Sequence, residues 1–219
     1  MLDFRPAWWL PGPHIQTVWG RLSRRRRLVG FEREVVEMPD GDELVLDHLP
    51  GEGPCRFILL HGLEGSSYSV YIQGILSRIA ARGLPATAIN FRSCARDPRR
   101  VLRSIPNRRP RFYHSGETTD FEFVVRTLKA REPKRVILAF GASLGGNVVL
   151  KWLGENPDQD LVRAAATISV PYDLGAGSRH LEKTFMGRMY VTSFLRSLRV
   201  KAAEVVRRFP ELQIILVCQ

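Results

Sequence analysis

Short, unbroken apolar runs recur along the middle of the chain, at residues 57–60, 86–91, 136–140 and 164–170. Runs that are apolar at consecutive rather than alternate positions are typical of parallel strands buried on both faces. Between the runs, two segments carry apolar residues at i, i+3, i+4 and i+7, the spacing of a helix with one buried stripe. The stripes are Ile72, Ile75, Leu76 and Ile79 in the first segment and Phe121, Val124, Val125 and Leu128 in the second. Strands that alternate with helices predict an α/β fold, in which a mostly parallel sheet carries helices on both faces.

An antiparallel hairpin is predicted ahead of these strands. Residues 31–38 and 43–49 are β-like, and Pro39-Asp40-Gly41-Asp42 between them has the residue types of a tight turn. Residues 1–30 are rich in tryptophan, proline and arginine, and we expect an irregular N-terminal arm that packs on the body through its indoles. Residues 31–174 then form the α/β core.

The last part of the chain, residues 175–219, has helical composition with mixed polarity. At this place in an α/β fold, such a segment is expected to begin a helical cap over the sheet edge. Residues 212–218 are again apolar and strand-like. The sequence stops directly afterwards, so we expect the C-terminal part of the fold to be incomplete.

Composition and charge narrow the choice of partners. With 219 residues, 44% apolar and 25% charged, the chain is expected to be one soluble globular domain. The net charge is +11, but only five of its 33 basic residues are lysines, and arginines are densest at 24–27 and 96–111. No helix-turn-helix, zinc or aromatic-interleaved basic pattern accompanies the charge, so we expect no specific nucleic acid partner. A peripheral contact with an anionic membrane remains open.

The cysteines and the N-terminal residues favour a reducing compartment. Cys55, Cys94 and Cys218 are scattered and contain no C-x-x-C pair, which fits neither a disulfide framework nor a zinc site. The N-terminus has no signal pattern, and no run of 18 apolar residues occurs. We therefore expect a cytoplasmic protein without a metal or cofactor.

The sequence Gly141-Ala142-Ser143-Leu144-Gly145 matches the G-x-S-x-G motif, and its setting makes the match informative. It directly follows the apolar run 136–140 and precedes a helical pattern at 147–153. This strand–turn–helix context is that of a nucleophile elbow, in which small residues on either side allow a turn tight enough to lift the serine hydroxyl above the sheet. Ser143 is therefore the predicted nucleophile.

A serine hydroxyl is a weak nucleophile at neutral pH, so the site must also stabilise the oxyanion of a tetrahedral intermediate with hydrogen-bond donors. The backbone N–H of Leu144, directly after the nucleophile, is the first predicted donor. The second is the backbone N–H of Leu63, in the loop His61-Gly62-Leu63-Glu64-Gly65 that follows the first apolar run. The two glycines of this loop allow it to turn its amides inward.

The acid and base of a triad are harder to find. In this kind of site they follow the nucleophile along the chain, in the order Ser, Asp or Glu, His. His61 precedes Ser143, so we expect it to brace its loop structurally. The only histidine after Ser143 is His180, and Asp173 follows the predicted strand at 164–170. Asp173 and His180 are the remaining candidates, but they equally fit a helix-capping aspartate and an exposed histidine.

Five segments of the chain form a recognisable series. They are Trp9-Leu10-Pro11-Gly12-Pro13-His14-Ile15-Gln16-Thr17, His61-Gly62-Leu63-Glu64-Gly65-Ser66-Ser67, Asn90-Phe91-Arg92, Tyr113-His114-Ser115-Gly116-Glu117 and Gly141-Ala142-Ser143-Leu144-Gly145-Gly146-Asn147. Taken in order, they resemble the YheT-like family of α/β-hydrolases. The resemblance implies an α/β-hydrolase fold with Ser143 as nucleophile, and structural or site-rim roles for His14 and His114. Ser93 departs from the family, which usually has glycine there.

The resemblance also implies an activity, since family members are described as predicted hydrolases, carboxylesterases and acylglycerol lipases. We expect a carboxylic ester hydrolase that forms an acyl-enzyme and acts on a small-molecule acyl ester or a lipid. The family continues past the end of this sequence, with an aspartate after one strand and a histidine after the last, so a truncated chain is expected. A catalytically inactive truncated hydrolase and an acyltransferase remain as alternatives.

Overall fold

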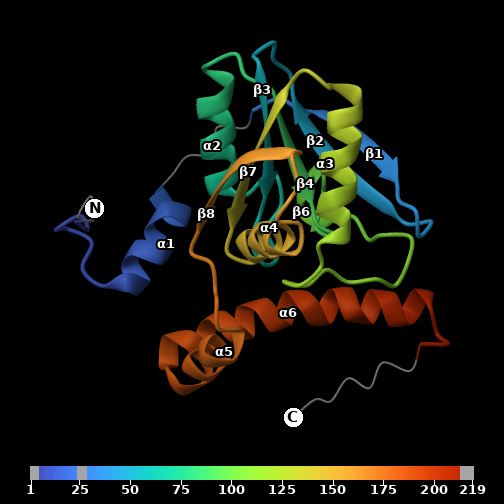
Figure 1. Cartoon of the computed structure of the whole chain (residues 1–219). Coiled ribbons are helices and arrows are strands. Elements are labelled where there is room, and N and C mark those ends of the chain that lie inside the picture. The colour runs from blue at the N-terminus through green and yellow to red at the C-terminus, as the bar shows by residue number, and fades with distance from the viewer. Residues whose placement is uncertain (1–4, 24–28, 213–219) are drawn as a thin grey trace.

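A mixed β-sheet flanked by helices forms the centre of the molecule (Figure 1). The computed structural model describes residues 5–23 and 29–212. Within these ranges one sheet has six strands in the order β1-β2-β4-β3-β7-β8, and a separate hairpin pairs β5 with β6. The strands are β1 (Glu32–Glu37), β2 (Glu43–Leu49), β3 (Cys55–Leu60), β4 (Ala86–Asn90), β5 (Arg96–Asp97), β6 (Arg100–Ser104), β7 (Val136–Ala142) and β8 (Val162–Ile168). The helices are α1 (Pro13–Ser23), α2 (Val70–Ala80), α3 (Thr119–Arg131), α4 (Leu144–Glu155), α5 (Leu174–Lys183) and α6 (Phe185–Arg208).

Strand directions confirm the predicted sheet. β3 runs parallel to β4 and to β7, and β7 runs parallel to β8. β2 is antiparallel to both β1 and β4, so the first hairpin extends the parallel part of the sheet. In the turn of that hairpin Gly41 has φ +75°, a backbone conformation that favours glycine. Its N–H donates to the carbonyl oxygen of Met38 at 2.8 Å and closes the turn.

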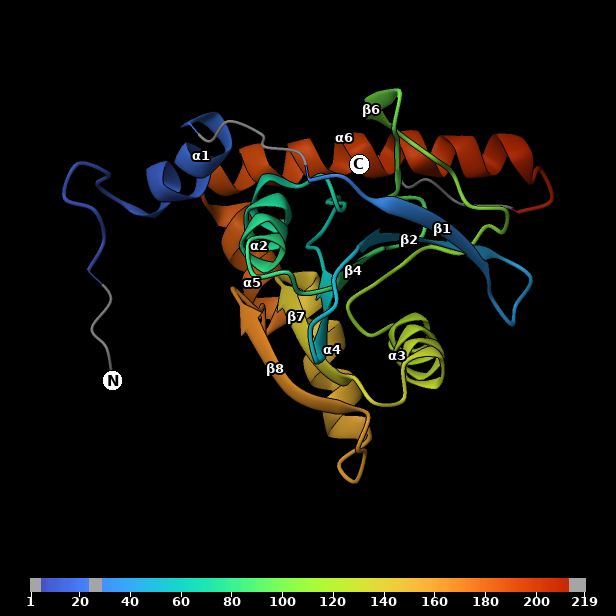
Figure 2. The same ribbon diagram turned by 90° about the horizontal axis from the view of Figure 1, so that it is seen from above.

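Helices cover both faces of the sheet, as predicted (Figure 2). α3 and α4 pack on one face, where Phe121 and Trp152 contact each other edge to face. α2 packs on the opposite face through Leu76 and its neighbours. Because successive side chains of a strand point to opposite faces, β3 contributes Leu60 to the first core and Leu59 to the second.

The prediction that every apolar run is buried on both faces is wrong for the last run. β8 is an edge strand of the described sheet, and its residues from Arg163 to Ala166 are exposed. An apolar run shows that burial is favourable, but it does not show whether another element covers the strand, and alanines gain little from burial. In β4, which has a neighbour on each side, all residues are buried.

The N-terminal arm also differs from its prediction. It contains a regular helix, α1, whose first residue is Pro13, a position at which the fixed φ of proline suits a helix. Trp8, Trp9 and Trp19 are 90%, 51% and 42% exposed, so they do not pack into the body. Trp9 and Trp19 instead contact each other edge to face, with ring centroids 5.5 Å apart.

The predicted helical segment near the C-terminus forms α5 and the long helix α6. Figure 1 shows α6 crossing one end of the sheet, and contacts between α6 and the loops after β3 and β4 identify that end as the carboxyl end of the parallel strands. The arginine run 24–27 and the predicted strand 212–218, apart from its first residue, lie outside the described residues. Over 5–23 and 29–212, no helix combines the length and apolarity needed to cross a membrane.

Candidate active site

Ser143 occupies a sharp turn between β7 and α4. Its backbone has φ +52° and ψ −118°, a strained conformation for a residue with a side chain. The turn is anchored on both sides, since the N–H of Ser143 donates to the carbonyl oxygen of Ile168 at 2.9 Å and its own carbonyl oxygen accepts from Gly146 N–H at 2.9 Å. The side chain is partly exposed. These are the features expected of a nucleophile elbow.

The glycines around Ser143 are required by close backbone contacts. A Cβ atom on Gly141 would lie 2.5 Å from the carbonyl oxygen of Gly145. A Cβ atom on Gly145 would lie 2.6 Å from the carbonyl oxygen of His61 and 2.7 Å from that of Leu60. The start of α4 therefore lies directly against the end of β3, and only glycine permits this approach.

The loop after β3 lies against the turn at Ser143. A Cβ atom on Gly62 would lie 3.1 Å from Ser143 Cβ, so this loop and the elbow are in contact. The Gly62 N–H donates to the Tyr71 hydroxyl at 2.7 Å, and the Glu64 N–H donates to the Tyr113 hydroxyl at 2.8 Å. The N–H of Leu63, between them, has no partner among the described residues. The role of the Leu63 N–H as the second oxyanion donor stays a prediction.

Leu144 is the other predicted donor. It is the first residue of α4, so its N–H lies at the helix N-terminus, where intrahelical partners are absent and the helix dipole favours negative charge. Ser143, directly before it, is the N-cap residue, and its side chain makes no capping hydrogen bond. The Ser143 hydroxyl is therefore not committed to capping the helix.

His61 is a structural residue, as expected from its place in the sequence. It is buried between the loops that follow β3 and β4. Its Nδ1 contacts the Gly62 carbonyl oxygen at 2.8 Å, and its Nε2 accepts from the Phe91 N–H at 3.1 Å. This pairing requires a neutral ring protonated on Nδ1. Burial lowers the pKa of His61 to about 4, so the neutral form predominates at neutral pH.

The low pKa of His61 predicts a pH-dependent stability. The unfolded chain binds a proton at this ring below about pH 6.5 and the folded chain only near pH 4. Stability from the neutral ring is therefore full above pH 6.5 and declines as the pH falls toward 4. Urea denaturation should show that the advantage of the native chain over His61→Gln shrinks by about 2–3 kcal/mol between pH 7 and pH 4.5. An advantage that stays constant would contradict this assignment.

The candidate acid and base do not meet Ser143. The Asp173 carboxylate accepts from Ala176 N–H at 2.7 Å and caps the start of α5. His180 is exposed on the same helix. No hydrogen bond that the structure describes joins either side chain to Ser143, and the helix-cap interpretation of Asp173 fits its contacts.

Two other histidines, in the segments that resemble the YheT-like family, lie near the surface. The Nδ1 of His14 is 3.4 Å from the Tyr190 hydroxyl and so links α1 to α6. The Nδ1 of His114 accepts from Gly116 N–H at 3.2 Å within its own loop. Neither contact reaches Ser143. In the described part of the chain, no three His, Cys, Asp or Glu side chains gather as a metal site requires.

Sequence analysis missed the side chains that hold the loop of Leu63. Tyr71, Tyr113 and Lys201 all bond to this loop from elsewhere in the chain. Tyr113 lies in one of the five segments that resemble the YheT-like family, so the sequence offered a signal that this residue matters. Tyr71 and Lys201 lie on ordinary helical segments, where nothing in the residue pattern marks them.

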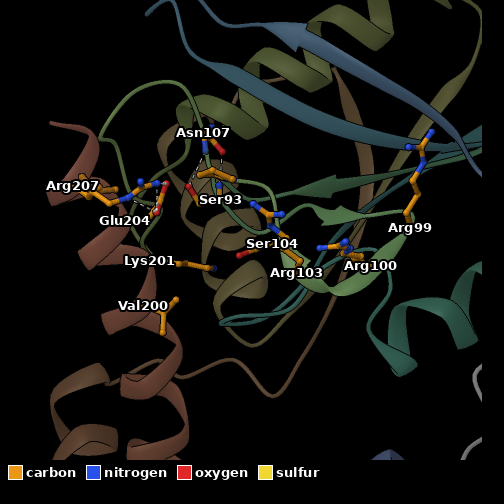
Figure 3. A pocket seen from close by; sticks show the side chains of 12 residues that line it. Ser93, Arg99, Arg100, Arg103, Ser104, Asn107, Val200, Lys201, Glu204 and Arg207 are labelled. Carbon is orange, nitrogen blue, oxygen red and sulfur yellow. Dashed lines mark hydrogen bonds and ion pairs between the residues drawn. The ribbon is translucent and has the colours of Figure 1, made fainter.

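A cavity of about 890 Å³ lies between α6 and the β5–β6 hairpin (Figure 3). Five of its twelve lining residues are basic, and the Arg207 side chain pairs with Glu204, the acidic residue of the lining. Lys201 reaches the cavity from α6, but Ser143 does not line it. Lys201 therefore connects this cavity with the loop that bears Leu63.

A parallel sheet with an elbow serine between a central strand and a helix defines the α/β-hydrolase class. Residues 56–194 match the family model described as "alpha/beta hydrolase fold". The chain therefore belongs to the α/β-hydrolase family, and within it resembles the YheT group: it is 34% identical over 95% of its length to "Putative esterase YheT" of Escherichia coli.

Other relatives and solved structures agree with this placement. The chain is 30% identical to the monoacylglycerol lipase of Saccharomyces cerevisiae over 63% of its length, and 27% identical to the human phospholipase ABHD3 over 89%. It spans 60% of YheT, 29% of the lipase and 48% of the phospholipase. The esterase Pf2001 of Pyrococcus furiosus superposes with a TM-score of 0.58 at 19% identity, covering 80% of this chain and 61% of the esterase. This last likeness is one of fold.

Proposed function

We propose that this chain carries the nucleophile and the oxyanion donors of a carboxylic ester hydrolase that works through an acyl-enzyme on Ser143. The main support is the strained backbone of Ser143, whose φ of +52° holds a partly exposed serine against the loop at Gly62. Relatives named as an esterase, a monoacylglycerol lipase and a phospholipase favour an acyl ester or a lipid as substrate.

The proposed chemistry follows from these groups. Ser143 Oγ attacks the ester carbonyl carbon, and the carbonyl oxygen becomes an oxyanion that accepts hydrogen bonds from the N–H groups of Leu63 and Leu144. The Ser143 proton passes to the leaving group, which departs as the alcohol. Water then attacks the acyl-enzyme carbonyl carbon, the acid is released, and Ser143 Oγ regains a proton from that water. Each backbone donor contributes about 3–4 kcal/mol to the transition state by analogy with other oxyanion holes.

The missing part of this chemistry is a base hydrogen-bonded to Ser143, which the described residues do not supply. Without a base, an oxyanion hole and binding contacts alone accelerate acyl transfer by about 10³–10⁴-fold over water. We therefore expect slow acylation of the 219-residue chain, restricted to Ser143.

A fluorophosphonate probe tests the proposal. The folded chain should be labelled at Ser143, and Ser143→Ala should remove the label completely, because the phosphonyl group forms its bond to that hydroxyl. Ser169→Ala is the matched control, since Ser169 also has a positive φ, of +55°, and is more exposed than Ser143. Intact-mass and peptide mass spectrometry measure both. Folded chain that stays unlabelled at high probe concentration would favour the inactive hydrolase instead.

A second candidate is acyl transfer to an alcohol. It is favoured by a yeast relative named "Medium-chain fatty acid ethyl ester synthase/esterase 2", 26% identical over 85% of this chain. An acyl-enzyme resolves with an alcohol as well as with water. The ratio of products from a thioester of a medium-chain acid in the presence of ethanol would separate the two, because a transferase passes the acyl group mainly to ethanol and a hydrolase mainly to water.

A further inference from the structure

Helix α6 reaches the loop of Leu63 through a buried ion pair. Lys201 Nζ donates to Glu64 Oε1 at 2.7 Å, and the two side chains are only 7% and 8% exposed. Ser197, one turn earlier on α6, donates its hydroxyl to the other carboxylate oxygen. A buried pair of this kind is sensitive to the loss of either partner, in contrast to a surface pair.

The carboxylate of Glu64 is coupled to its own backbone. The Tyr113 hydroxyl accepts from the Glu64 N–H and donates to Glu64 Oε1, both at 2.8 Å. The backbone of Glu64 has φ +55°, which a residue with a side chain adopts only when its surroundings enforce it. Tyr113 is held in turn by stacking on Phe91, with ring centroids 5.2 Å apart. The position of the carboxylate thus determines the position of the peptide after Leu63.

We propose that Lys201 is a positioning residue for Ser143 chemistry, because through Glu64 and Tyr113 it holds the Leu63 N–H toward the nucleophile. The inference rests on the proposed function and extends it to a residue 137 positions from Glu64. Leu63 lies between two fixed neighbours: Gly62 is held by Tyr71 and Glu64 by Tyr113. Lys201 supports the second of these anchors.

The charge of Lys201 is what the arrangement requires. Burial raises the pKa of Glu64, but hydrogen bonds from Lys201 and Ser197 outweigh burial and leave that pKa below its usual value. The carboxylate therefore stays ionised inside the protein. If the ammonium group is removed, an ionised carboxylate is left buried without its cation and moves toward water. This movement breaks its bond with Tyr113 and releases the loop.

The kinetic test measures fluorophosphonate labelling of Ser143 and separates the maximal rate of inactivation from probe affinity. Lys201→Met should lower the maximal rate about 10–100-fold with little change in affinity, because a displaced oxyanion donor acts on the transition state. Adding Glu64→Gln to Lys201→Met should restore at least half of that loss on a logarithmic scale, since an uncharged amide can still accept from Tyr113. An unchanged rate in Lys201→Met, or no recovery in the double variant, overturns the proposal.

The matched control is Arg208→Met. Arg208 also lies on α6 and donates to the Asn107 carbonyl oxygen at 2.7 Å, so its removal weakens the attachment of α6 without affecting Glu64. If Lys201 serves only to dock the helix, Lys201→Met and Arg208→Met should affect labelling alike. The proposal requires that Arg208→Met keep the native rate.

Amide hydrogen exchange of residues 62–65 provides a readout that does not depend on activity. Faster exchange at Glu64 in Lys201→Met, and native exchange in Arg208→Met and in the double variant, would support the positioning role even if native chain is not labelled. In that case only the proposed function fails. Native exchange at Glu64 in Lys201→Met refutes the positioning role whatever the labelling shows.

Discussion

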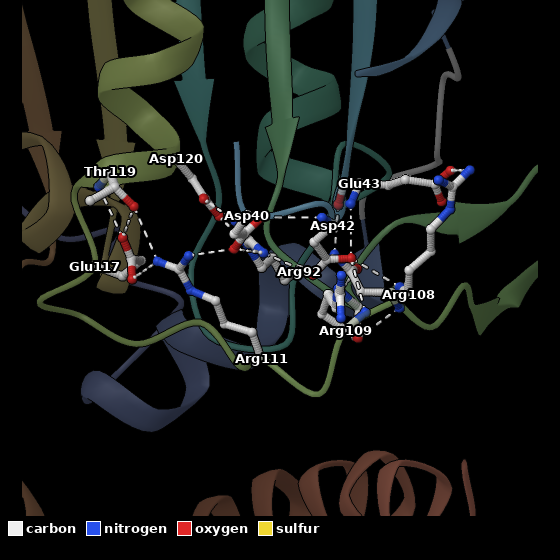
Figure 4. A network of polar contacts seen from close by, with 12 residues as sticks. Asp40, Asp42, Glu43, Arg92, Arg108, Arg109, Arg111, Glu117, Thr119 and Asp120 are labelled. Carbon is white, nitrogen blue, oxygen red and sulfur yellow. Dashed lines mark hydrogen bonds and ion pairs between the residues drawn. The ribbon is translucent and has the colours of Figure 1, made fainter. Parts of the chain in front are cut away.

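Replacing Arg92 by methionine should lower the free energy of unfolding by about 3–5 kcal/mol, because it leaves buried carboxylates without their cation. The Arg92 side chain is 1% exposed and lies among three aspartates (Figure 4). Its Nε and Nη2 donate to both oxygens of Asp120 at 2.8 and 2.7 Å, and its Nη1 donates to Asp40 and Asp42 at 2.8 Å each. Equilibrium urea unfolding of the two proteins measures the difference.

The position of this cluster explains the size of the expected effect. Asp40 and Asp42 lie in the β1–β2 turn, Asp120 lies in the first turn of α3, and Arg92 follows β4. One guanidinium group therefore joins the hairpin, the sheet and a helix. Both hydrogen bonds that the structure describes for the Asp120 carboxylate come from Arg92, whereas Asp42 also accepts from the Arg108 N–H at 2.9 Å.

Two further variants test whether the loss of stability comes from buried, unpaired carboxylates. Arg126→Met removes an arginine of α3 whose side chain is 60% exposed and pairs with Glu122, and it should cost no more than about 0.5 kcal/mol. Arg92→Met combined with Asp120→Asn should be more stable than Arg92→Met alone, because the second change removes a stranded charge. If Arg92→Met costs as little as Arg126→Met, the buried charges do not stabilise the fold.

The backbone is strained at the carboxyl end of the parallel strands, where Ser143 lies. Each of the four parallel strands β3, β4, β7 and β8 is followed, within four residues, by a non-glycine residue with positive φ. These residues are Glu64, Ser93, Ser143 and Ser169. Binding sites of α/β sheets lie at the carboxyl ends of their strands, and strain concentrates at functional sites. At position 93 the φ of +59° also explains why the resembling family usually has glycine there.

Features set by neighbouring residues could be predicted from the sequence. The turn at Gly41, the alternation of strands and helices, and the setting of Ser143 all depend on local residue types and on periodicity. The prediction of Leu63 as an oxyanion donor used the same kind of reasoning, because the glycines of a loop after a central strand allow its backbone N–H groups to turn toward the site. The capping aspartate at 173 is equally local, since its partner is Ala176.

Features set by distant partners could not be predicted. In the sequence, Lys201 is one polar residue among others in a helical segment, and only the folded chain brings it to Glu64. The burial of Arg92 likewise depends on aspartates 28 to 52 positions away. The exposure of β8 and of the arm indoles shows the same limit from the other side, because an apolar residue type does not reveal whether anything lies over it.

Gly145→Ala should both destabilise the protein and slow the labelling of Ser143. An added Cβ would lie 2.6 Å from the His61 carbonyl oxygen and 2.7 Å from that of Leu60, and neither backbone atom can move without shifting β3. The expected loss of stability is about 3 kcal/mol, the upper end of what overpacking usually costs. Since the clash separates α4 from the loop after β3, the N–H groups of Leu144 and Leu63 move apart. A misplacement of about 1 Å lowers a rate on the order of 10²-fold.

Gly154→Ala is the matched control for this prediction, because Gly154 lies in the same helix and a Cβ there would contact nothing within 4 Å. It should raise stability by up to about 1 kcal/mol, as alanine is the better helix former, and leave labelling unchanged. Thermal or urea unfolding and the rate of fluorophosphonate labelling measure both variants. If Gly145→Ala unfolds and labels like Gly154→Ala, the close packing of α4 against β3 is wrong, and with it the placement of the two oxyanion donors.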